Sequence, residues 1–477
     1  MLFNSFEFLI FFPIVTIAYY LSPHRFRWIL LLLASCVFYM FFVPIYILIL
    51  LITILIDYFA AIYISKATSE RRRKTCLVLS ILSTCIVLII FKYFNFFNDN
   101  IRLLAEAAHW HYPVNPLKIL LPIGLSFHTF QSLSYVIEVY RNKQKAEKHF
   151  GIYALYVMFY PQLVAGPIER PQNMLHQFYE KHEFDYSNVV EGLKRMLWGY
   201  FKKVVIADRL SIYVAAINSN YKHHNGTSLT LAAIFFGFQI YCDFSAYSDI
   251  AIGSARVMGF KLMTNFNLPF FSRNVTEFWR RWHISLSTWF NDYLFTPLSF
   301  NFRYWGTTGI LLAIMITFFT SGLWHGAGWT FILFGVFHGL AVCYETLTKK
   351  FRKKAAKAIP RIIYTNLSIL FTFTFACFTW IFFRATSMEQ ADTIIKRILF
   401  VRGPLFLGFS NRDMIYAVVF LLVLLVKEFI EEHKLFNNFS LYHNSNAVVR
   451  QLTYYSLIVL IMLFGVFDGS QFIYFQF

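Results

Sequence analysis

Two histidines lie within one apolar stretch, SGLWHGAGWTFILFGVFHGL at residues 321–340, which is long enough to cross a bilayer. An ionisable side chain at membrane depth is costly unless it faces a bundle interior or a cavity. His325 follows Trp324 and is flanked by glycine and alanine, which let a ligand approach closely. A neutral imidazole can accept the proton of a hydroxyl that attacks an acyl thioester. We predict His325 as the catalytic base; a buried histidine bonded to a backbone carbonyl is the alternative.

His338 follows thirteen residues later and is a less specific candidate for a functional residue. In an unbroken helix this spacing gives a rotation of ~220° after whole turns, so the two histidines would face apart. Gly335 and Gly339 bracket His338 in a G-x-x-x-G pattern, which is typical of close helix packing. Substrate binding and helix packing both remain open for His338. Trp324 is a further candidate for donor binding.

A second cluster, FWRRWHISLSTWF at residues 278–290, combines two arginines and a histidine with three tryptophans. On a single helix, Arg280 and His283 would share one face. Arginines bind phosphate-like anions through paired hydrogen bonds, whereas an aromatic belt with arginines reaching the membrane interface is the alternative. The residues predicted here to bind the donor or to stabilise an oxyanion are His283, Arg280, Arg281 and Trp279.

Asp243 and Asp249 lie inside an apolar run of span length, residues 239–253. Carboxylates at such a depth need cationic partners, and Arg280 or Arg281 are the expected ones. Asp249 is a candidate for donor binding, although a structural ion pair is at least as compatible with the pattern. In residues 121–141, by contrast, His128, Gln131 and Glu138 are expected to form hydrogen bonds between helices.

The elements that must position these residues are membrane helices. The chain has 477 residues, of which 58% are hydrophobic and 14% charged, whereas soluble domains hold ~25% charged residues. Apolar runs of about 20 residues recur from end to end, each able to span a bilayer. We expect an all-α polytopic membrane protein, one domain over residues 1–477 with roughly ten to twelve spans. The first apolar stretch, near 6–22, is expected to be a retained span.

The net charge of +18 has a topological explanation. Basic residues collect in the short segments 66–74, 141–148 and 349–361, which the positive-inside rule places in the cytoplasm. A nucleic-acid partner is therefore not expected, and the lipid bilayer is. The six cysteines form no C-x-x-C pair, and the sequence has neither an H-E-x-x-H motif nor a phosphate loop. We expect no metal site and no bound cofactor.

Taken together and in order, several motifs resemble the membrane-bound O-acyltransferase family, in particular its bacterial branch that includes the alginate O-acetyltransferase. They cover roughly residues 120–385 and are LPIGLSFHTFQ, AGPIERP, YCDFSAYSDIAIG, FWRRWHISLS, SGLWHGAGW followed by FHGL, and CFTWIFFRA. The resemblance implies a helical bundle with re-entrant or interfacial helices around a central funnel. It implies that the essential histidine of the family is His325 and that a second important histidine is His283. It further implies a cytoplasmic donor, acetyl-CoA, and an extracytoplasmic acceptor or periplasmic acetyltransferase partner.

The expected function is therefore O-acetylation of an exported cell-surface polysaccharide, alginate-like or another exopolysaccharide, at the bacterial inner membrane. Peptidoglycan O-acetylation and D-alanyl transfer to teichoic acid are the alternatives within the enzymes. A transporter or flippase, or a scaffold of a secretion complex, are the alternatives outside them. The sequence shows no inverted repeat that would favour a transporter. It does not identify the acceptor polymer.

Overall fold

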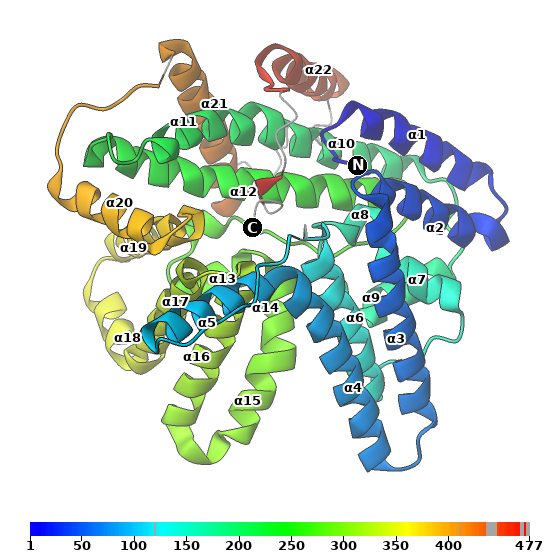
Figure 1. Cartoon of the computed structure of the whole chain (residues 1–477). Coiled ribbons are helices and arrows are strands. Elements are labelled where there is room, and N and C mark those ends of the chain that lie inside the picture. The colour runs from blue at the N-terminus through cyan, green and yellow to red at the C-terminus, as the bar shows by residue number, and fades with distance from the viewer. Residues whose placement is uncertain (119–120, 409, 436–445, 468–471, 474–477) are drawn as a thin grey trace. The chain divides into compact units, whose positions relative to one another are not determined.

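The computed structural model describes the chain except for residues 119–120, 409, 436–445, 468–471 and 474–477. The described residues form helices and connecting segments and contain no strand, as the all-α prediction requires (Figure 1). They group into two compact units, which are considered separately. The first unit holds residues 1–193 and 251–263, and the second holds 194–250 and 264–477. The expectation of a single domain stays a prediction.

The first unit is built on the helices α3, α4 and α6, which pack against one another. Asp57 of α3 is buried and accepts hydrogen bonds from Ser80 of α4, at 2.5 Å, and Ser132 of α6. Gln131 donates to the backbone oxygen of Tyr156 at 2.5 Å, so α6 forms the interhelical hydrogen bonds expected of it. The helices are α1 Phe6–Leu21, α2 His24–Met40, α3 Ile47–Lys66, α4 Glu70–Leu88, α5 Phe94–Ala107, α6 Leu125–Tyr140, α7 Phe150–Met158, α8 Tyr160–Leu163 and α9 Pro171–Met174.

The second unit is organised around a hairpin of two apolar helices, α16 and α17. Two helices, α10 Tyr186–Tyr200 and α12 Gly226–Val257, contribute residues to both units. The other helices are α11 Asp208–Ser219, α13 Val275–Arg281, α14 Ile284–Phe290, α15 Thr296–Asn301, α16 Gly306–His325, α17 Trp329–Leu347, α18 Lys349–Ala358, α19 Arg361–Arg384, α20 Met388–Phe400, α21 Asn411–Glu432 and α22 Ala447–Phe464.

Seven helical segments among the described residues are long and apolar enough to cross a membrane. They contain α3, α4 with α5, α12, α16, α17, α19 and α22. The predicted count of ten to twelve is therefore not confirmed. Some of the other expected spans are shorter, such as α1 and α6 with 16 residues each, and α21 carries charges at both ends. The outward faces of the spans are apolar, with Met462 and Leu463 of α22 at least 70% exposed, as lipid contact requires.

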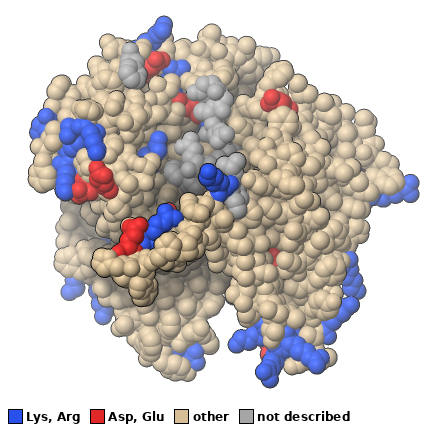
Figure 2. All heavy atoms as spheres, in the orientation of Figure 1, with Lys and Arg blue, Asp and Glu red and all other residues tan. Residues whose placement is uncertain are grey.

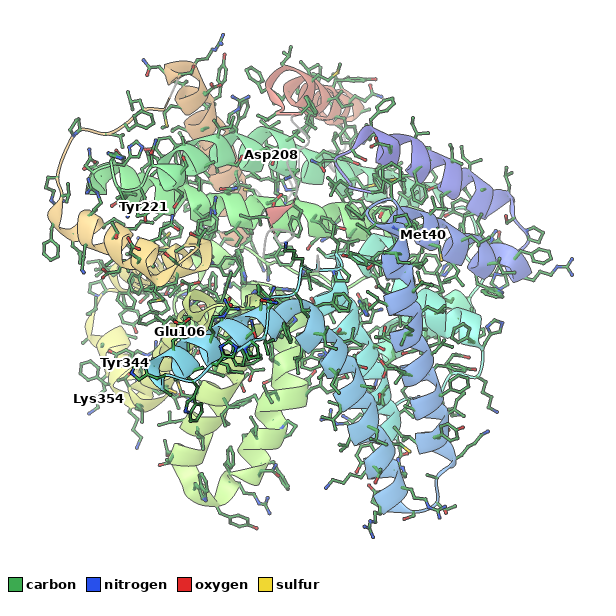
Figure 3. The ribbon with its side chains drawn as sticks, in the orientation of Figure 1. Met40, Glu106, Asp208, Tyr221, Tyr344 and Lys354 are labelled. Atoms are coloured by element: carbon green, nitrogen blue, oxygen red, sulfur yellow. The ribbon has the colours of Figure 1, made fainter. Side chains whose placement is uncertain are left out.

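Basic residues gather at helix ends. Figure 2 shows Lys and Arg where α3 turns into α4, the position of the exposed side chains Lys66, Arg71, Arg72 and Lys74. In the second unit, α17 ends just beyond Tyr344, and the following α18 carries Lys354 (Figure 3). Their placement at the ends of apolar helices fits a role in setting membrane topology.

Candidate active site

The hairpin of α16 and α17 is held together by glycines. A Cβ atom on Gly335 would lie 2.2 Å from the backbone oxygen of Phe318, and one on Gly322 would lie 2.4 Å from that of Phe331. No larger residue fits at either position. A Cβ atom on Gly339, the second glycine of the G-x-x-x-G pattern, would lie 3.1 Å from Cβ of Phe318, so both glycines of the pattern lie in a close helix contact, which was one of the expected alternatives. The short segment 326–328 separates the two helices, since α16 ends at His325 and α17 begins at Trp329. The close contact fixes the position of His325, the last residue of α16.

His325 is buried in an aromatic environment, with 4% of its surface exposed. Its ring centroid lies 4.9 Å from that of Trp324, 5.3 Å from Phe383 of α19 and 5.6 Å from Phe334 of α17. An aromatic setting keeps water away from the imidazole, which suits a general base that acts on a bound hydroxyl. The surroundings of His325 therefore fit the predicted role.

The stretch 278–290 does not form one helix, which corrects the expectation that Arg280 and His283 share a helical face. The helix α13 ends at Arg281, Trp282 is extended, and His283 has a left-handed φ of 43° before α14 begins. The bend turns His283 into the interior, where its side chain is fully buried, whereas Arg280 is exposed. The structure does not bring these two residues together.

The orientation of His283 is set by Asn265, which precedes the short segment leading to α13. The Nδ1 atom of His283 lies 3.2 Å from Oδ1 of Asn265. The backbone N–H of Ser285 donates to the same oxygen, at 3.2 Å, which identifies that atom as an acceptor. Nδ1 therefore carries the proton, and the lone pair of the neutral ring is on Nε2. Burial lowers the pKa of His283 to about 3, so the imidazole is neutral at physiological pH.

One indole contacts both histidines. Trp324 lies 6.1 Å from His283 and 4.9 Å from His325, measured between ring centroids. Phe244 of α12 lies on His283 at 4.6 Å. The two histidines that were predicted from different motifs thus share one buried aromatic environment.

His338 belongs to a different part of this environment. Its Nδ1 accepts a hydrogen bond from the indole N–H of Trp279 at 3.1 Å, and its Nε2 lies 3.0 Å from the hydroxyl of Thr379. That hydroxyl donates to the backbone oxygen of Ala376, so Nε2 of His338 is the donor. Both ring nitrogens therefore join α13, α17 and α19. Because the helix breaks at 326–328, the rings of His338 and His325 nevertheless both contact the ring of Phe334.

Arg281 is held by carboxylates. Its guanidinium contacts Glu277 at 2.8 Å and Glu432 of α21 at 2.7 Å. Among the ion pairs of the described residues, neither Asp243 nor Asp249 pairs with Arg280 or Arg281, the expected partners, because both aspartates have lysine partners on a neighbouring helix. The functional roles predicted for Arg280, Arg281 and Trp279 stay predictions.

Those lysines lie in the π-helical segment Phe201–Ala207 between α10 and α11. Lys202 contacts Asp249 at 2.7 Å, and Lys203 contacts Asp243 at 2.8 Å. Arg195 completes the first group with a contact of 2.8 Å to Asp249. The predictions made from the sequence did not include these buried pairs. The signal was available, since two lysines and two aspartates in apolar surroundings each require a partner.

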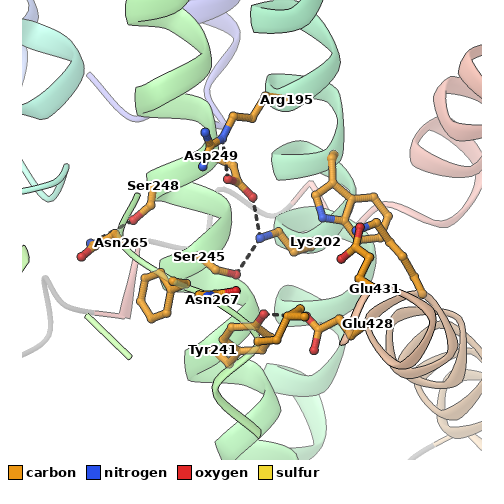
Figure 4. A pocket seen from close by; sticks show the side chains of 14 residues that line it. Arg195, Lys202, Tyr241, Ser245, Ser248, Asp249, Asn265, Asn267, Glu428 and Glu431 are labelled. Atoms are coloured by element: carbon orange, nitrogen blue, oxygen red, sulfur yellow. Dashed lines mark hydrogen bonds and ion pairs between the residues drawn. The ribbon is translucent and has the colours of Figure 1, made fainter. Parts of the chain in front are cut away.

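A polar cavity of about 490 Å³ lies beside the group formed by Arg195, Lys202 and Asp249 (Figure 4). Asn265 is part of its wall and donates to Ser248 at 3.2 Å, so one side chain connects the cavity wall to His283. The lining includes charged and aromatic side chains, namely Arg195, Lys202, Lys427, Asp249, Glu428, Glu431, Trp198 and Tyr241. A polar cavity next to buried imidazoles is an arrangement suited to acid–base chemistry on a bound polar substrate.

A buried histidine pair in a helical membrane protein, with a polar cavity alongside, is consistent with acyl transfer. The chain belongs to the MBOAT, membrane-bound O-acyltransferase family, whose sequence pattern matches residues 16–388. It is therefore a multi-pass membrane protein and an acyltransferase, rather than a transporter or a scaffold. The match extends beyond the predicted core of 120–385 into the N-terminal helices.

Several curated proteins are similar to this chain. It is 37% identical over 396 residues to the Pseudomonas aeruginosa protein described as "Probable alginate O-acetylase AlgI", covering 82% of this chain and 73% of that protein. It is 33% identical to the "Peptidoglycan O-acetyltransferase" of Helicobacter pylori, covering 78% and 74% respectively. It is 27% identical to the "Teichoic acid D-alanyltransferase" of Bacillus subtilis, covering 57% and 70%.

Proposed function

We propose that this acyltransferase moves an acetyl group from a cytoplasmic donor, acetyl-CoA, to the hydroxyl of an exported cell-surface polysaccharide. The proposal includes a location in the bacterial inner membrane. The observation that carries it is the burial of His283 and His325 against one indole in a member of an acyltransferase family. Direct transfer to the polymer and transfer through a periplasmic acetyltransferase partner are both compatible with this arrangement.

In the proposed mechanism, His325 accepts the proton of the attacking hydroxyl, and the oxygen adds to the thioester carbonyl. The tetrahedral intermediate then expels the thiolate, which takes up a proton. His283 is held by Asn265 with its lone pair on Nε2, so it acts as a fixed acceptor that orients the hydroxyl or the leaving thiol. The aromatic rings around His325 exclude water, which would otherwise hydrolyse the thioester.

The polar cavity of about 490 Å³ is the proposed place for the hydrophilic part of the donor. Glu428 and Glu431 of α21 line this cavity, and Glu432, the last residue of the same helix, pairs with Arg281. Two backbone N–H groups at the start of α13, those of Val275 and Thr276, donate to Glu345, which lies just before the basic segment 349–361. These contacts favour an opening of the cavity on the side of the membrane where the basic segment 349–361 lies. The positive-inside rule assigns that side to the cytoplasm.

The acceptor is proposed from the relatives. Two of the relatives above 30% identity carry names that refer to O-acetylation of alginate and of peptidoglycan, which favours acetate over D-alanine as the transferred group. D-alanyl transfer remains the second candidate, because the more distant relative carries that name. Both groups are released by mild base and are told apart by mass.

The experiment that tests the proposal measures ester-linked acetate and D-alanine on fractionated cell-surface glycans. It compares wild type, a deletion strain, and the deletion complemented with His325→Ala, His283→Ala or the exposed control His223→Ala at matched protein level. We expect the deletion and both active-site variants to lose acetate from one polymer and the control to restore it. Restoration by His325→Ala would exclude that residue as the base, and loss of D-alanine instead of acetate would replace the proposed acyl group.

A further inference from the structure

A short basic helix, α18, connects the ends of two apolar helices of the second unit. It extends from Lys349 to Ala358 and has ten residues. One residue separates it from α17 and two residues separate it from α19. Both of these neighbours are long and apolar enough to cross a membrane. Because a helix of this length is only ~15 Å long, both ends of α18 are held close to the membrane surface.

This helix has an excess of positive charge that the surrounding sequence does not balance. The stretch 346–388 contains no aspartate or glutamate. Among the ion pairs of the described residues, the one that involves α18 joins Arg352 to Glu345 of α17, at 3.9 Å. Five further cations of α18 are exposed and take no part in those ion pairs, namely Lys349, Lys350, Lys353, Lys354 (labelled in Figure 3) and Lys357.

The five lysines lie on one side of the helix, which we call the lysine face. At 100° per residue they fall within an arc of about 140°, and Arg352 and Ala355 fall outside it. Ala355 is half-buried, and Arg352 contacts Glu345. The side opposite the lysine face is thus turned toward the protein, so the lysine face itself is turned outward.

Glu345, the carboxylate nearest to α18 in the sequence, is already engaged at the start of α13. It accepts hydrogen bonds from the backbone N–H groups of Val275, at 2.6 Å, and Thr276, at 3.0 Å. Its side chain is also buried. Glu345 therefore does not neutralise the lysine face, and the anions that do so must come from outside the described chain.

An exposed aromatic side chain adjoins the lysine face. Phe351 lies about 60° from Lys354 around the helix, and 71% of its surface is exposed. Leu347 before the helix and Ile362 after it are exposed as well. A soluble anion would leave these apolar side chains in water. At a membrane surface, by contrast, they enter the boundary of the acyl chains while the lysines reach the headgroups.

We propose that the lysine face of α18 binds the phosphates of anionic phospholipids in the adjoining leaflet, with Phe351 inserted beside them. Charge complementarity favours an anionic headgroup over a zwitterionic one, in which an ammonium group offsets the phosphate. Each lysine near an anionic membrane surface strengthens the attraction about fivefold. The positive-inside rule assigns this leaflet to the cytoplasmic side. The proposal concerns a surface outside the candidate active site and does not depend on the proposed function.

Photo-crosslinking locates the lipids that contact the full-length protein in nanodiscs. The nanodiscs contain three parts phosphatidylcholine to one part phosphatidylglycerol. In parallel samples, an equal small amount of either lipid carries a photoactivatable diazirine close to its headgroup. Mass spectrometry of proteolytic peptides quantifies the crosslinks within residues 349–361. The readout is the ratio of crosslinks from the phosphatidylglycerol probe to those from the phosphatidylcholine probe.

The test variant combines Lys350→Gln with Lys354→Gln, which removes two neighbouring charges from the lysine face. The other three lysines remain, so the topological signal is preserved. A second variant, Lys350→Arg with Lys354→Arg, changes the same positions and keeps their charge. The control combines Lys222→Gln with Arg402→Gln, which removes two exposed charges outside α18.

We expect a ratio of about five or more at residues 349–361 of wild type, and a lower ratio at high salt, which screens exposed charges. The glutamine variant should lose most of this preference, whereas the arginine variant and the control should keep it. A wild-type ratio near one, or an unchanged ratio in the glutamine variant, overturns the proposal. Displacement of the phosphatidylglycerol crosslinks by acetyl-CoA or inorganic phosphate at matched ionic strength would assign the lysine face to a soluble anion and also overturn it.

Discussion

The side-chain oxygen of Asn265 lies 3.2 Å from Nδ1 of His283 and so determines which nitrogen of that imidazole carries the proton. Both side chains are buried. The substitution Asn265→Ala removes the acceptor, so His283 can change tautomer and rotate. We expect the acyl-transfer rate to fall about tenfold or more, as is typical when the partner that orients a functional histidine is lost. Single-turnover transfer by purified protein measures this.

Two variants make that comparison specific. Asn265→Asp keeps an oxygen in place and should retain more activity than Asn265→Ala. Asn267→Ala changes another asparagine of the same cavity wall, one whose side chain has no contact with His283 among the described hydrogen bonds, and should leave the chemical step unchanged. An Asn265→Ala protein with wild-type turnover would contradict the assigned tautomer.

His338 and His325 should respond differently to substitution. His338→Phe leaves Trp279 and Thr379 without their shared partner, which we expect to cost about 1–3 kcal/mol of stability. His325→Gln should leave the melting temperature close to wild type and abolish transfer. Thermal unfolding and turnover per folded molecule, measured on both variants, separate the two roles. Full loss of turnover in a stable His338→Phe protein would show that His338 acts in catalysis.

The Lys202–Asp249 contact offers a test of the buried charges. Lys202→Met leaves Asp249 with Arg195 alone in a polar but largely buried site, and we expect a loss of about 3 kcal/mol or more. The double variant Lys202→Met with Asp249→Leu should regain part of that stability, because no carboxylate is left without its lysine. Chemical or thermal unfolding of the single and double variants in detergent gives the coupling free energy between Lys202 and Asp249. Additive losses in the double variant would mean that the two charges do not stabilise each other.

Glu169 should make the stability of the protein depend on pH. Burial raises the pKa of Glu169 from 4.5 to about 7, and its Oε1 accepts the backbone N–H of Met263. Because the folded-state pKa is above the ordinary value, the protonated carboxyl favours the folded state. This contribution is complete below about pH 4.5 and is lost as the pH rises through 7.

The change Glu169→Gln removes this ionisation while keeping an oxygen for Met263. We expect the wild-type melting temperature to fall between pH 5 and 8 and the Glu169→Gln protein to show a weaker dependence, with a difference in free energy of up to about 3 kcal/mol. Glu180→Gln, at an exposed glutamate of the same unit, is the control and should follow wild type. Parallel curves for wild type and Glu169→Gln would exclude an unusual pKa.

The apolar periodicity of the chain predicted helices well because membrane spans are selected for length and hydrophobicity, which are local properties. The helix break at 326–328 also has a local cause, because Gly326 and Gly328 have low helix propensity. The predicted count of ten to twelve spans is not confirmed, because the lengths of α1 and α6 and the terminal charges of α21 depend on where each helix ends.

The contacts of the candidate site were harder to predict because they join distant segments. His283 and His325 were identified from residue type and resemblance, but the partner that orients His283 lies 18 residues away in a loop without a motif. Arg280 and Arg281 were the predicted partners of Asp243 and Asp249, whereas α12 packs its aspartates against lysines of the π-helical segment. Which cation reaches a carboxylate is decided by packing, and spacing in sequence does not contain that information.

The backbone of His283 has a left-handed φ of 43°, which limits the residue types that this position accommodates without strain. Asparagine tolerates this conformation better than most residues, whereas β-branched side chains are strained in it. Asparagine and histidine codons differ by a single base. A lineage that changes the chemistry of this position can therefore pass between the two residues in one step while the bend between α13 and α14 persists. His283→Asn is accordingly a replacement compatible with the backbone of this bend.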